Sequence, residues 1–196
     1  MINTDTTGQI HVLLGLPGSG KGTQATRICE DVDIIHLSSG DIFRRFAANS
    51  HSNRLYRRIR EHIDCGELVP NDLACNIVMR EIESIHRDGK GVILDGFPRT
   101  LSQAEFLDER LSENDGHISS IINLAVSEET SLERILDRGR HDDLPEIAKK
   151  RLEVHLRLSD PVLDYYRCKG RLVEVDGDRA QDEVKTDLLR VMGVEI

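Results

Sequence analysis

A glycine-rich loop directly after a short apolar run constrains this chain more than any other feature. The run IHVLL covers residues 10–14, and GLPGSGKGT follows from Gly15 to Thr23, before a stretch of helical periodicity. This matches the pattern Gly-x-x-x-x-Gly-Lys, in which small residues let successive backbone N–H groups surround a phosphate and the helix N-terminus adds its dipole. The pattern predicts a strand, a phosphate-binding loop and a helix, with Lys21 reaching the β- and γ-phosphates of a nucleotide.

Two details narrow the interpretation of this loop. Gly22 follows Lys21 where such loops usually have Ser or Thr, so the usual hydroxyl ligand of Mg²⁺ is missing there, and Thr23 comes one position later. The dinucleotide pattern Gly-x-Gly-x-x-Gly is not satisfied, because counting from Gly18 its last position is Thr23. The loop therefore favours a nucleoside triphosphate.

Aliphatic runs recur along the chain between longer stretches of helical period. Further strands are predicted at 34–37, 91–95, 120–126 and 171–175, and helices at 21–31, 72–87, 101–112 and 128–138. Five buried parallel strands with crossover helices predict a three-layer α/β sandwich. Two segments depart from simple alternation. Residues 40–87 contain three helical patterns, interrupted at 49–51 and 66–71, and RGRHDDLP at 138–145 is a short charged loop.

Composition limits the partners and the compartment. The 196 residues fit one domain, and a formal charge of −9 with 4% aromatic residues and no Trp argues against a nucleic-acid partner. The N-terminus has no basic residue before its five-residue apolar run, so we expect neither a signal peptide nor a membrane span. Cysteines at 29, 65, 75 and 168 form no Cys-x-x-Cys pair, which favours reduced, mostly buried thiols of a cytoplasmic protein over a zinc site.

Four strings in a fixed order carry a resemblance to a known family. They are GKGT within the loop, SSGDIFR at 38–44, LDGFPRTLSQ at 94–103, and RILDRGRHDD at 134–143 followed by KKRL at 149–152. Over nearly its whole length the chain resembles the adenylate kinase family of nucleoside monophosphate kinases. The resemblance implies a single P-loop kinase domain over 1–196, with a monophosphate-binding helical insert at 38–88 and a very short lid at 138–145.

The resemblance also implies two nucleotide sites. The ATP-binding residues that it implies are Gly15, Pro17, Gly18, Ser19, Gly20, Lys21, Gly22, Thr23, Arg134, Arg138 and Arg179. Those implied for AMP are Ser39, Gly40, Arg44, Glu67, Leu68, Val69, Gly96, Phe97, Arg99, Gln103, Arg140 and Arg151. Arg134 corresponds to the residue that stacks on the ATP adenine, and Gln103 to the residue that reads the monophosphate base. Arg44 and Arg99 match a clamp on the monophosphate, for which a guanidinium fork is well suited.

The implied chemistry depends on charge and alignment. Lys21, Arg99, Arg138, Arg140 and Arg151 match catalytic positions around the transferred phosphoryl group, and Asp95 matches a residue that holds Mg²⁺ through water, unless it is a turn or capping carboxylate. The attacking phosphate oxygen is already ionised near neutral pH, so none of the eight histidines is needed as a general base.

Four residues keep alternative interpretations. Asp142 and Asp143 match a paired-carboxylate position, although Asp143 fits a helix cap equally well, and His141 is expected to be a solvated loop residue. Asp41 belongs either to the phosphate region or to a cap. The proposed site carries a charge of +3, and the rest of the chain then carries −12, so a basic cleft is expected in an acidic protein. The residues counted are Lys21, Arg44, Arg99, Arg134, Arg138, Arg140 and Arg151 as +7, and Asp41, Asp95, Asp142 and Asp143 as −4.

The reaction expected from this resemblance is Mg·ATP + AMP ⇌ 2 ADP. One alternative is a kinase for UMP, CMP or GMP, and another is a non-catalytic protein that senses ATP or assembles around it. The full set of arginines disfavours the second alternative, because binding alone would not require five of them at phosphate positions. The expected partners are ATP, AMP and ADP with Mg²⁺, without nucleic acid or membrane, and family analogy suggests a monomer.

Overall fold

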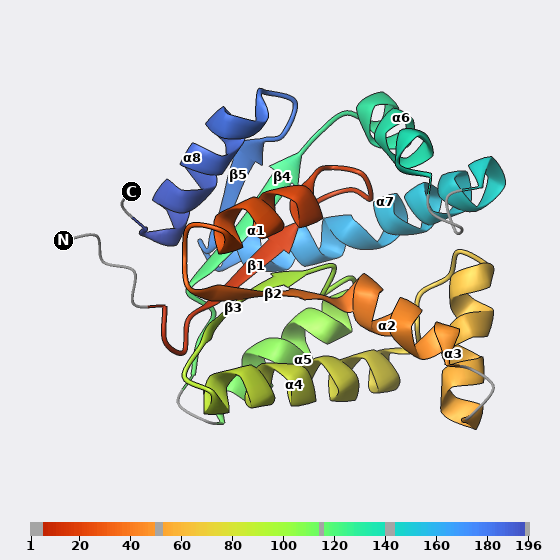
Figure 1. Ribbon diagram of the computed structural model, residues 1–196, viewed down its shortest axis with the longest axis horizontal. Helices are drawn as coiled ribbons and strands as arrows, with labels where there is room; N and C mark the ends of the chain where they lie inside the picture. Colours follow the sequence, from red (N-terminus) through yellow and green to blue (C-terminus); the bar gives the residue numbers. More distant parts are fainter. Residues whose placement is uncertain (1–5, 50–52, 114–115, 140–143, 195–196) are drawn as a thin grey trace.

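Five parallel strands form one sheet at the centre of the computed structural model, which describes residues 6–49, 53–113, 116–139 and 144–194 (Figure 1). The strand order is β2-β3-β1-β4-β5. The strands are β1 (Ile10–Leu14), β2 (Ile34–Ser38), β3 (Gly91–Asp95), β4 (Ser120–Ala125) and β5 (Leu172–Asp176). All four pairings are parallel, so every strand ends at the same edge of the sheet. The predicted α/β fold with a five-stranded parallel sheet is confirmed.

Helices cover both faces of this sheet (Figure 1). They are α1 (Lys21–Cys29), α2 (Ser39–Ala48), α3 (Arg54–Asp64), α4 (Asn71–Arg87), α5 (Leu101–Ser112), α6 (Glu128–Arg138), α7 (Pro145–Cys168) and α8 (Gln181–Met192). One face is covered by α1 and α8, and the other by α4, α5 and α7. The three helical patterns predicted between residues 40 and 87 are α2, α3 and α4.

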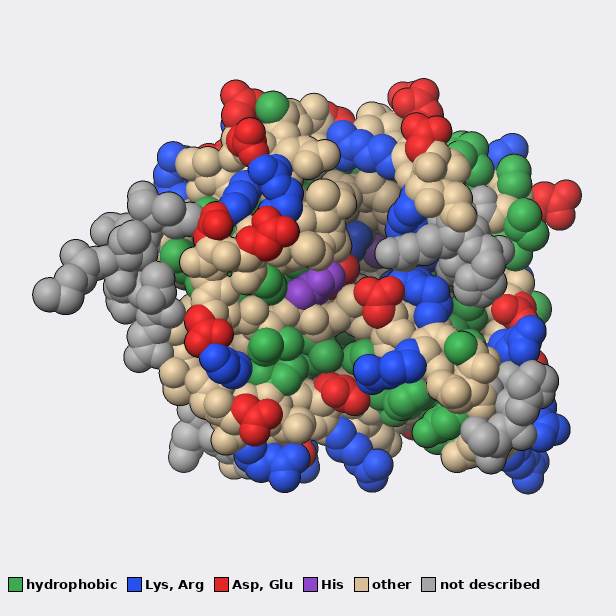
Figure 2. All heavy atoms as spheres, in the orientation of Figure 1, with side chains coloured by type: hydrophobic (Ala, Val, Ile, Leu, Met, Phe, Trp, Pro, Cys, Tyr) green, Lys and Arg blue, Asp and Glu red, His purple; other side chains and the backbone are tan. Residues whose placement is uncertain are grey.

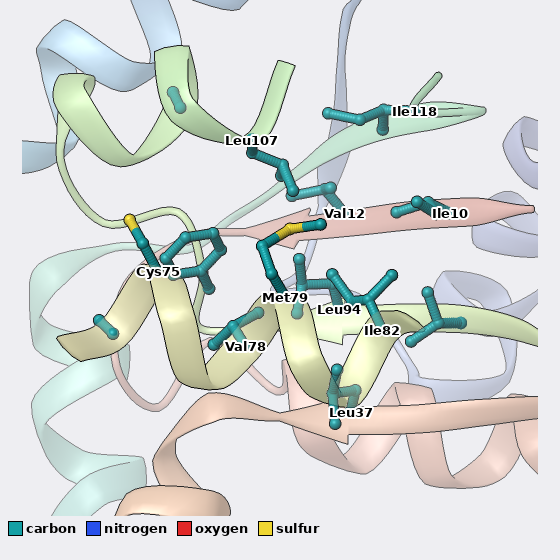
Figure 3. Packing of buried hydrophobic residues seen from close by; sticks show 14 of the residues in the cluster. Ile10, Val12, Leu37, Cys75, Val78, Met79, Ile82, Leu94, Leu107 and Ile118 are labelled. Carbon is teal, nitrogen blue, oxygen red and sulfur yellow. The ribbon is translucent and has the colours of Figure 1, made fainter. Parts of the chain in front are cut away.

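Alternate strand residues supply two separate hydrophobic cores. Val12 and Leu94 face α4 and α5, while Leu13 and Ile93 face α1 and α8, as the two-residue period of a strand requires. Figure 3 shows α4 presenting Met79 to the sheet. All four strand residues are fully buried, as are Ile121 and Ile122 of β4, so the three central strands β3, β1 and β4 are packed on both faces.

The expectation of five buried strands is wrong for the two outer ones. Ile35 in β2 and Val173 in β5 are each 40% exposed. Each of these strands lies at an edge of the sheet and pairs with one neighbour only. The helices that cover the sheet therefore leave part of each edge strand exposed.

Side-chain caps define where several helices begin. Ser38 caps α2 by accepting a hydrogen bond of 3.2 Å from the Asp41 backbone N–H, and Thr100 caps α5 in the same way through Gln103. The N-cap position is therefore held by Ser38, while the Asp41 carboxylate pairs with Arg44 at 2.5 Å and Asp41 lines the cleft described below. Leu144 occupies the N-cap position of α7, and Asp143 lies outside the described residues.

The four cysteines are free thiols, but the expectation that most are buried is wrong. Cys75 is buried and Cys29 half-buried, whereas Cys65 and Cys168 are exposed, because they lie at the C-terminal ends of α3 and α7, beyond the packed face of each helix. No helix within the described ranges is both long enough and apolar enough to cross a membrane.

Candidate active site

The glycine-rich loop joins the buried end of β1 to α1, and glycine is required there because the loop packs closely on its neighbours. At Gly18, φ is +83°, and an added Cβ would stand 2.4 Å from the backbone oxygen of Ser131 in α6. The Ser131 hydroxyl donates in turn to the Pro17 carbonyl oxygen. The loop is therefore held against α6, with the N-terminus of α1 facing a cleft of about 730 Å³.

Lys21 is the first residue of α1 and folds back over the loop. Its Nζ donates to the carbonyl oxygens of Gly15 and Leu16 at 2.9 and 2.8 Å, and to Ser19 Oγ at 3.2 Å. Burial lowers the pKa of Lys21 to about 8; Asp95 opposes this shift, and nearby arginines reinforce it. A phosphate in the cleft would supply the negative charge that this lysine environment lacks.

Asp95 ends β3 beside the loop. A Cβ on Gly22 would stand 3.4 Å from Asp95 Oδ2, and His36 Nε2 lies 3.4 Å from the same oxygen. Burial raises the pKa of this carboxyl, but the hydrogen bond from His36 and the positive charges of Lys21 and Arg99 together bring it below its ordinary value. An ionised oxygen ligand in a wet cleft fits Mg²⁺, which keeps much of its water and takes further oxygens from phosphates.

Three arginines converge next to Asp95. Arg99 donates from Nε to the Gly96 carbonyl oxygen at 2.8 Å, and burial lowers its pKa to about 10, with Arg151 and Arg44 adding to the shift and Asp95 opposing it. Arg44, Arg99 and Arg151 line both the cleft and a smaller adjoining cavity of about 70 Å³. Such a concentration of guanidinium groups is suited to a phosphate.

The smaller cavity has apolar walls from the insert and a polar end at Gln103. Of the residues predicted for AMP, those that line it are Gly40, Arg44, Glu67, Leu68, Val69, Gly96, Phe97, Arg99, Gln103 and Arg151. Gln103 is buried; its Oε1 accepts from the Arg99 backbone N–H at 2.7 Å, and its Nε2 donates to Asn71 Oδ1 at 2.8 Å. Ser39 lies behind the cavity wall, where its hydroxyl donates to the Gly96 carbonyl oxygen at 2.7 Å.

The far end of the cleft is built from α6 and from the turn after β5. Arg134 donates to the Gly177 carbonyl oxygen at 3.2 Å, and Arg179 pairs with Asp187 on α8. The predicted ATP residues lining the cleft are Pro17, Gly18, Ser19, Gly20, Lys21, Gly22, Thr23, Arg134, Arg138 and Arg179. Gly15 instead faces a cavity behind the loop. The predicted Arg140, together with His141, Asp142 and Asp143, lies outside the described residues.

Several residues of these cavities were not predicted. Gly177, Gln181 and Val184 line the cleft, and the position of Gly177 just after a parallel strand could have indicated this. His155 lines the small cavity and the one behind the loop, one helical turn after Arg151 on α7. Burial, reinforced by Lys21 and Arg99, lowers the pKa of His155 to about 3, so its ring is neutral.

The cleft lies at the carboxyl ends of parallel strands, with a phosphate loop on one side and an arginine-lined second cavity on the other. This arrangement places the chain among the P-loop nucleoside monophosphate kinases. Figure 2 shows this cleft near the centre of one face, with basic side chains along its wall. The family model described as adenylate kinase matches residues 13–171, and the chain belongs to this family.

Curated relatives agree over nearly their whole lengths. An adenylate kinase of Corynebacterium urealyticum is 40% identical over 173 residues, covering 88% of this chain and 93% of the relative. An adenylate kinase of Thermus thermophilus is 39% identical over 191 residues, covering 95% of this chain and 98% of the relative. One from Limosilactobacillus reuteri is 38% identical over 214 residues, covering 92% of this chain and 97% of the relative.

Proposed function

We propose that this chain catalyses Mg·ATP + AMP ⇌ 2 ADP in the cleft and its adjoining cavity. The observation that carries the proposal is the wall that the two spaces share: Arg44, Arg99 and Arg151 line both of them. Transfer between two phosphates requires them to meet without water between them, and a shared boundary of guanidinium groups allows this. The family membership and the names of the relatives support the same reaction.

Each part of the cleft then has a role. The phosphate loop and Lys21 bind the triphosphate, while Arg134 and Arg179 flank its base. Arg44 and Arg99 orient the monophosphate, so that one of its ionised oxygens faces the γ-phosphorus. Arg99, Arg138, Arg140 and Arg151 stabilise the charge on the transferred group, and catalysis depends on alignment and electrostatics.

Asp95 is the residue that would hold Mg²⁺, through water. The ion, when bound with ATP, neutralises charge on the β- and γ-phosphates. His36 Nε2 lies 3.4 Å from Asp95 Oδ2, and Gly22 borders the carboxylate without a side chain that would fill the space beside it. Among the described residues no cluster of three or more histidines, cysteines or acids could hold another metal. The lid segment 138–145 contains no cysteine, so we expect that after exhaustive chelation Mg²⁺ alone restores activity, and that purified protein contains no stoichiometric zinc.

The proposed covers of the cleft are the helical insert at 38–88 and the short lid at 138–145. Both border the cavities, through Arg44 in the first and Arg138 in the second, and closing them would keep water from the γ-phosphate. All of the proposed groups come from one chain, so we also propose a monomer, which a mass measurement in solution tests. Free thiols on the surface fit a reducing compartment such as the cytoplasm.

A coupled assay of ADP formation from ATP with AMP, UMP, CMP and GMP in parallel tests the proposal. AMP should give the highest kcat/KM. A preference for UMP or CMP would replace AMP kinase by pyrimidine monophosphate kinase. ATP binding without ADP formation from any acceptor would instead indicate a nucleotide sensor.

A further inference from the structure

An unusual concentration of positive charge lies in the insert. Residues 42–60 contain six arginines and no acidic residue, in a chain whose formal charge is −9. Three of the six already have local roles: Arg44 lines the cavities, Arg45 lies 3.7 Å from Glu81, and Arg60 lies 3.2 Å from Asp64. The other three, Arg54, Arg57 and Arg58, are all on α3 and exposed, and none makes an ion pair with a described residue. We call these three residues the α3 arginine face.

The packing of α3 turns this face outward. Ile59 is fully buried against α2, and Tyr56 stacks on Phe46 with ring centroids 4.8 Å apart, so these residues fix the inner side of the helix. The three arginines follow an i, i+3, i+4 spacing and are neighbours on the helix surface. Figure 2 shows basic side chains gathered over α3 at the lower right.

This arrangement does not serve the stability of α3. Like charges three and four residues apart on a helix repel, and Arg54 lies in the first turn, where the helix dipole disfavours a cation. The first turn of α3 has no acidic residue to compensate, although the chain contains 35 acidic residues elsewhere. Glu61, further along α3, makes no ion pair with any of the three arginines, so their charge is available to an anion from solution.

The other end of α3 leads to the small cavity. Ile63 in its last turn and Glu67 in the segment that follows both line that cavity. The overall negative charge of the chain repels an approaching nucleotide, while a basic helix whose last turn lines the cavity attracts it locally. We propose that the α3 arginine face is the encounter surface for the nucleoside monophosphate dianion, which it steers into the cavity; this inference rests on the proposed function.

The dependence on ionic strength distinguishes steering from direct binding. The Debye length falls from about 30 Å at 0.01 M salt to about 8 Å at 0.15 M, so attraction by charges outside the cavity fades over this range. Replacing all three arginines by Gln should lower kcat/KM for AMP about threefold or more at 0.01 M, and by less than about 1.5-fold at 0.15 M. The kcat, and kcat/KM for ATP, should stay at their wild-type values.

Two further variants serve as controls. Arg80, Arg87 and Arg157 are also exposed and make no ion pair with a described residue, but they lie on α4 and α7, so replacing them by Gln removes the same charge elsewhere. This control variant should keep the wild-type salt dependence for AMP. Replacing the α3 arginine face by Lys should also keep it, because steering requires charge and not the guanidinium fork.

The outcomes separate this inference from the proposed function. Absence of ADP formation by the wild-type protein would refute the proposed function itself. With an active wild type, an unchanged salt dependence in the Gln variant would refute steering alone, as would an equal loss in the α4 and α7 control. A fall in kcat, or failure of the Lys variant to retain the wild-type rate, would show that the arginines act by contact after binding.

Discussion

Replacing Gly18 by Ala tests how tightly the phosphate loop is fixed to α6. A residue other than glycine at positive φ costs roughly 1–2 kcal/mol. The new Cβ would also stand 2.4 Å from the Ser131 carbonyl oxygen and 3.0 Å from a side-chain carbon of Ile135. The oxygen belongs to helix backbone and cannot rotate away, so the loop must shift, at an overpacking cost of about 1–3 kcal/mol.

Gly89, in the turn after α4, provides a matched control. Its φ is +72°, close to the +83° of Gly18, but nothing lies within 4 Å of its added Cβ. Gly89→Ala should therefore show the backbone cost alone, and Gly18→Ala the same cost plus the contact. A domain of this size loses roughly 2–4 °C of Tm per kcal/mol, so Gly18→Ala should melt roughly 2–12 °C below Gly89→Ala.

Activity gives a second measurement on the same pair of variants. Gly89→Ala should retain wild-type kinetics, while Gly18→Ala should raise KM for ATP at least about tenfold, because a displaced loop no longer directs its N–H groups at the phosphates. Equal melting temperatures for the two variants, or normal ATP kinetics in Gly18→Ala, would show that the loop is not held against α6 as described.

Four further results are expected. Affinity for ATP in the absence of AMP should fall by up to about tenfold per pH unit above pH 8, where free Lys21 loses its proton, and Lys21→Arg should abolish this slope in calorimetric titrations. Gln103→Leu should raise KM for AMP far more than KM for ATP, since it removes the polar end of the small cavity and leaves the polar edge of the AMP base unpaired at a cost of about 1–3 kcal/mol; equal effects on both nucleotides would contradict the assignment. Arg140→Ala should lower kcat much more than it raises KM for AMP, and an unchanged kcat would show that the lid lies elsewhere. Burial lowers the pKa of His11 to about 4, so between about pH 6.5 and pH 4 the unfolded chain binds a proton at His11 that the folded chain does not. The free energy of unfolding should therefore decrease as the pH is lowered through this range, and less steeply in His11→Gln, which urea titrations at several pH values can show.

The glycine-rich loop and the strand periods were sufficient to predict the layers and most of the elements. Residues 128–138 form α6 as predicted, and the segment from 40 to 87 contains the three predicted helices, α2, α3 and α4. The order of the strands in the sheet could not be derived from these patterns, because the periodicity of apolar residues indicates which residues are buried but not which strand pairs with which. The partial exposure of Ile35 and Val173 follows from that order, since only the order makes β2 and β5 the edges.

The candidate site was predicted mainly through family resemblance. The structure adds the hydrogen bonds and positions of its side chains, which a sequence motif does not specify. The string LDGFPRTLSQ contains Arg99 and Gln103, yet nothing in it indicates that the Gln103 side chain accepts from the Arg99 backbone. Ser39 is likewise in its predicted string, although its hydroxyl faces Gly96 behind the cavity wall. His155 was missed because a single histidine carries no pattern, and only the helical turn that separates it from Arg151 could have indicated its place.

The strand order also has a consequence for how this chain is made. The central strand β1 is synthesised early, but Ile10 pairs with Val92, which is 82 residues later, and His11 with Ser120, later still. At about 5–20 residues per second, ribosomes need roughly 4–16 s to add those 82 residues. During that interval the apolar segment IHVLL has neither of its neighbours and both its edges are open. The nascent chain is therefore most exposed to aggregation and to chaperone binding at the segment that becomes most deeply buried in the finished enzyme.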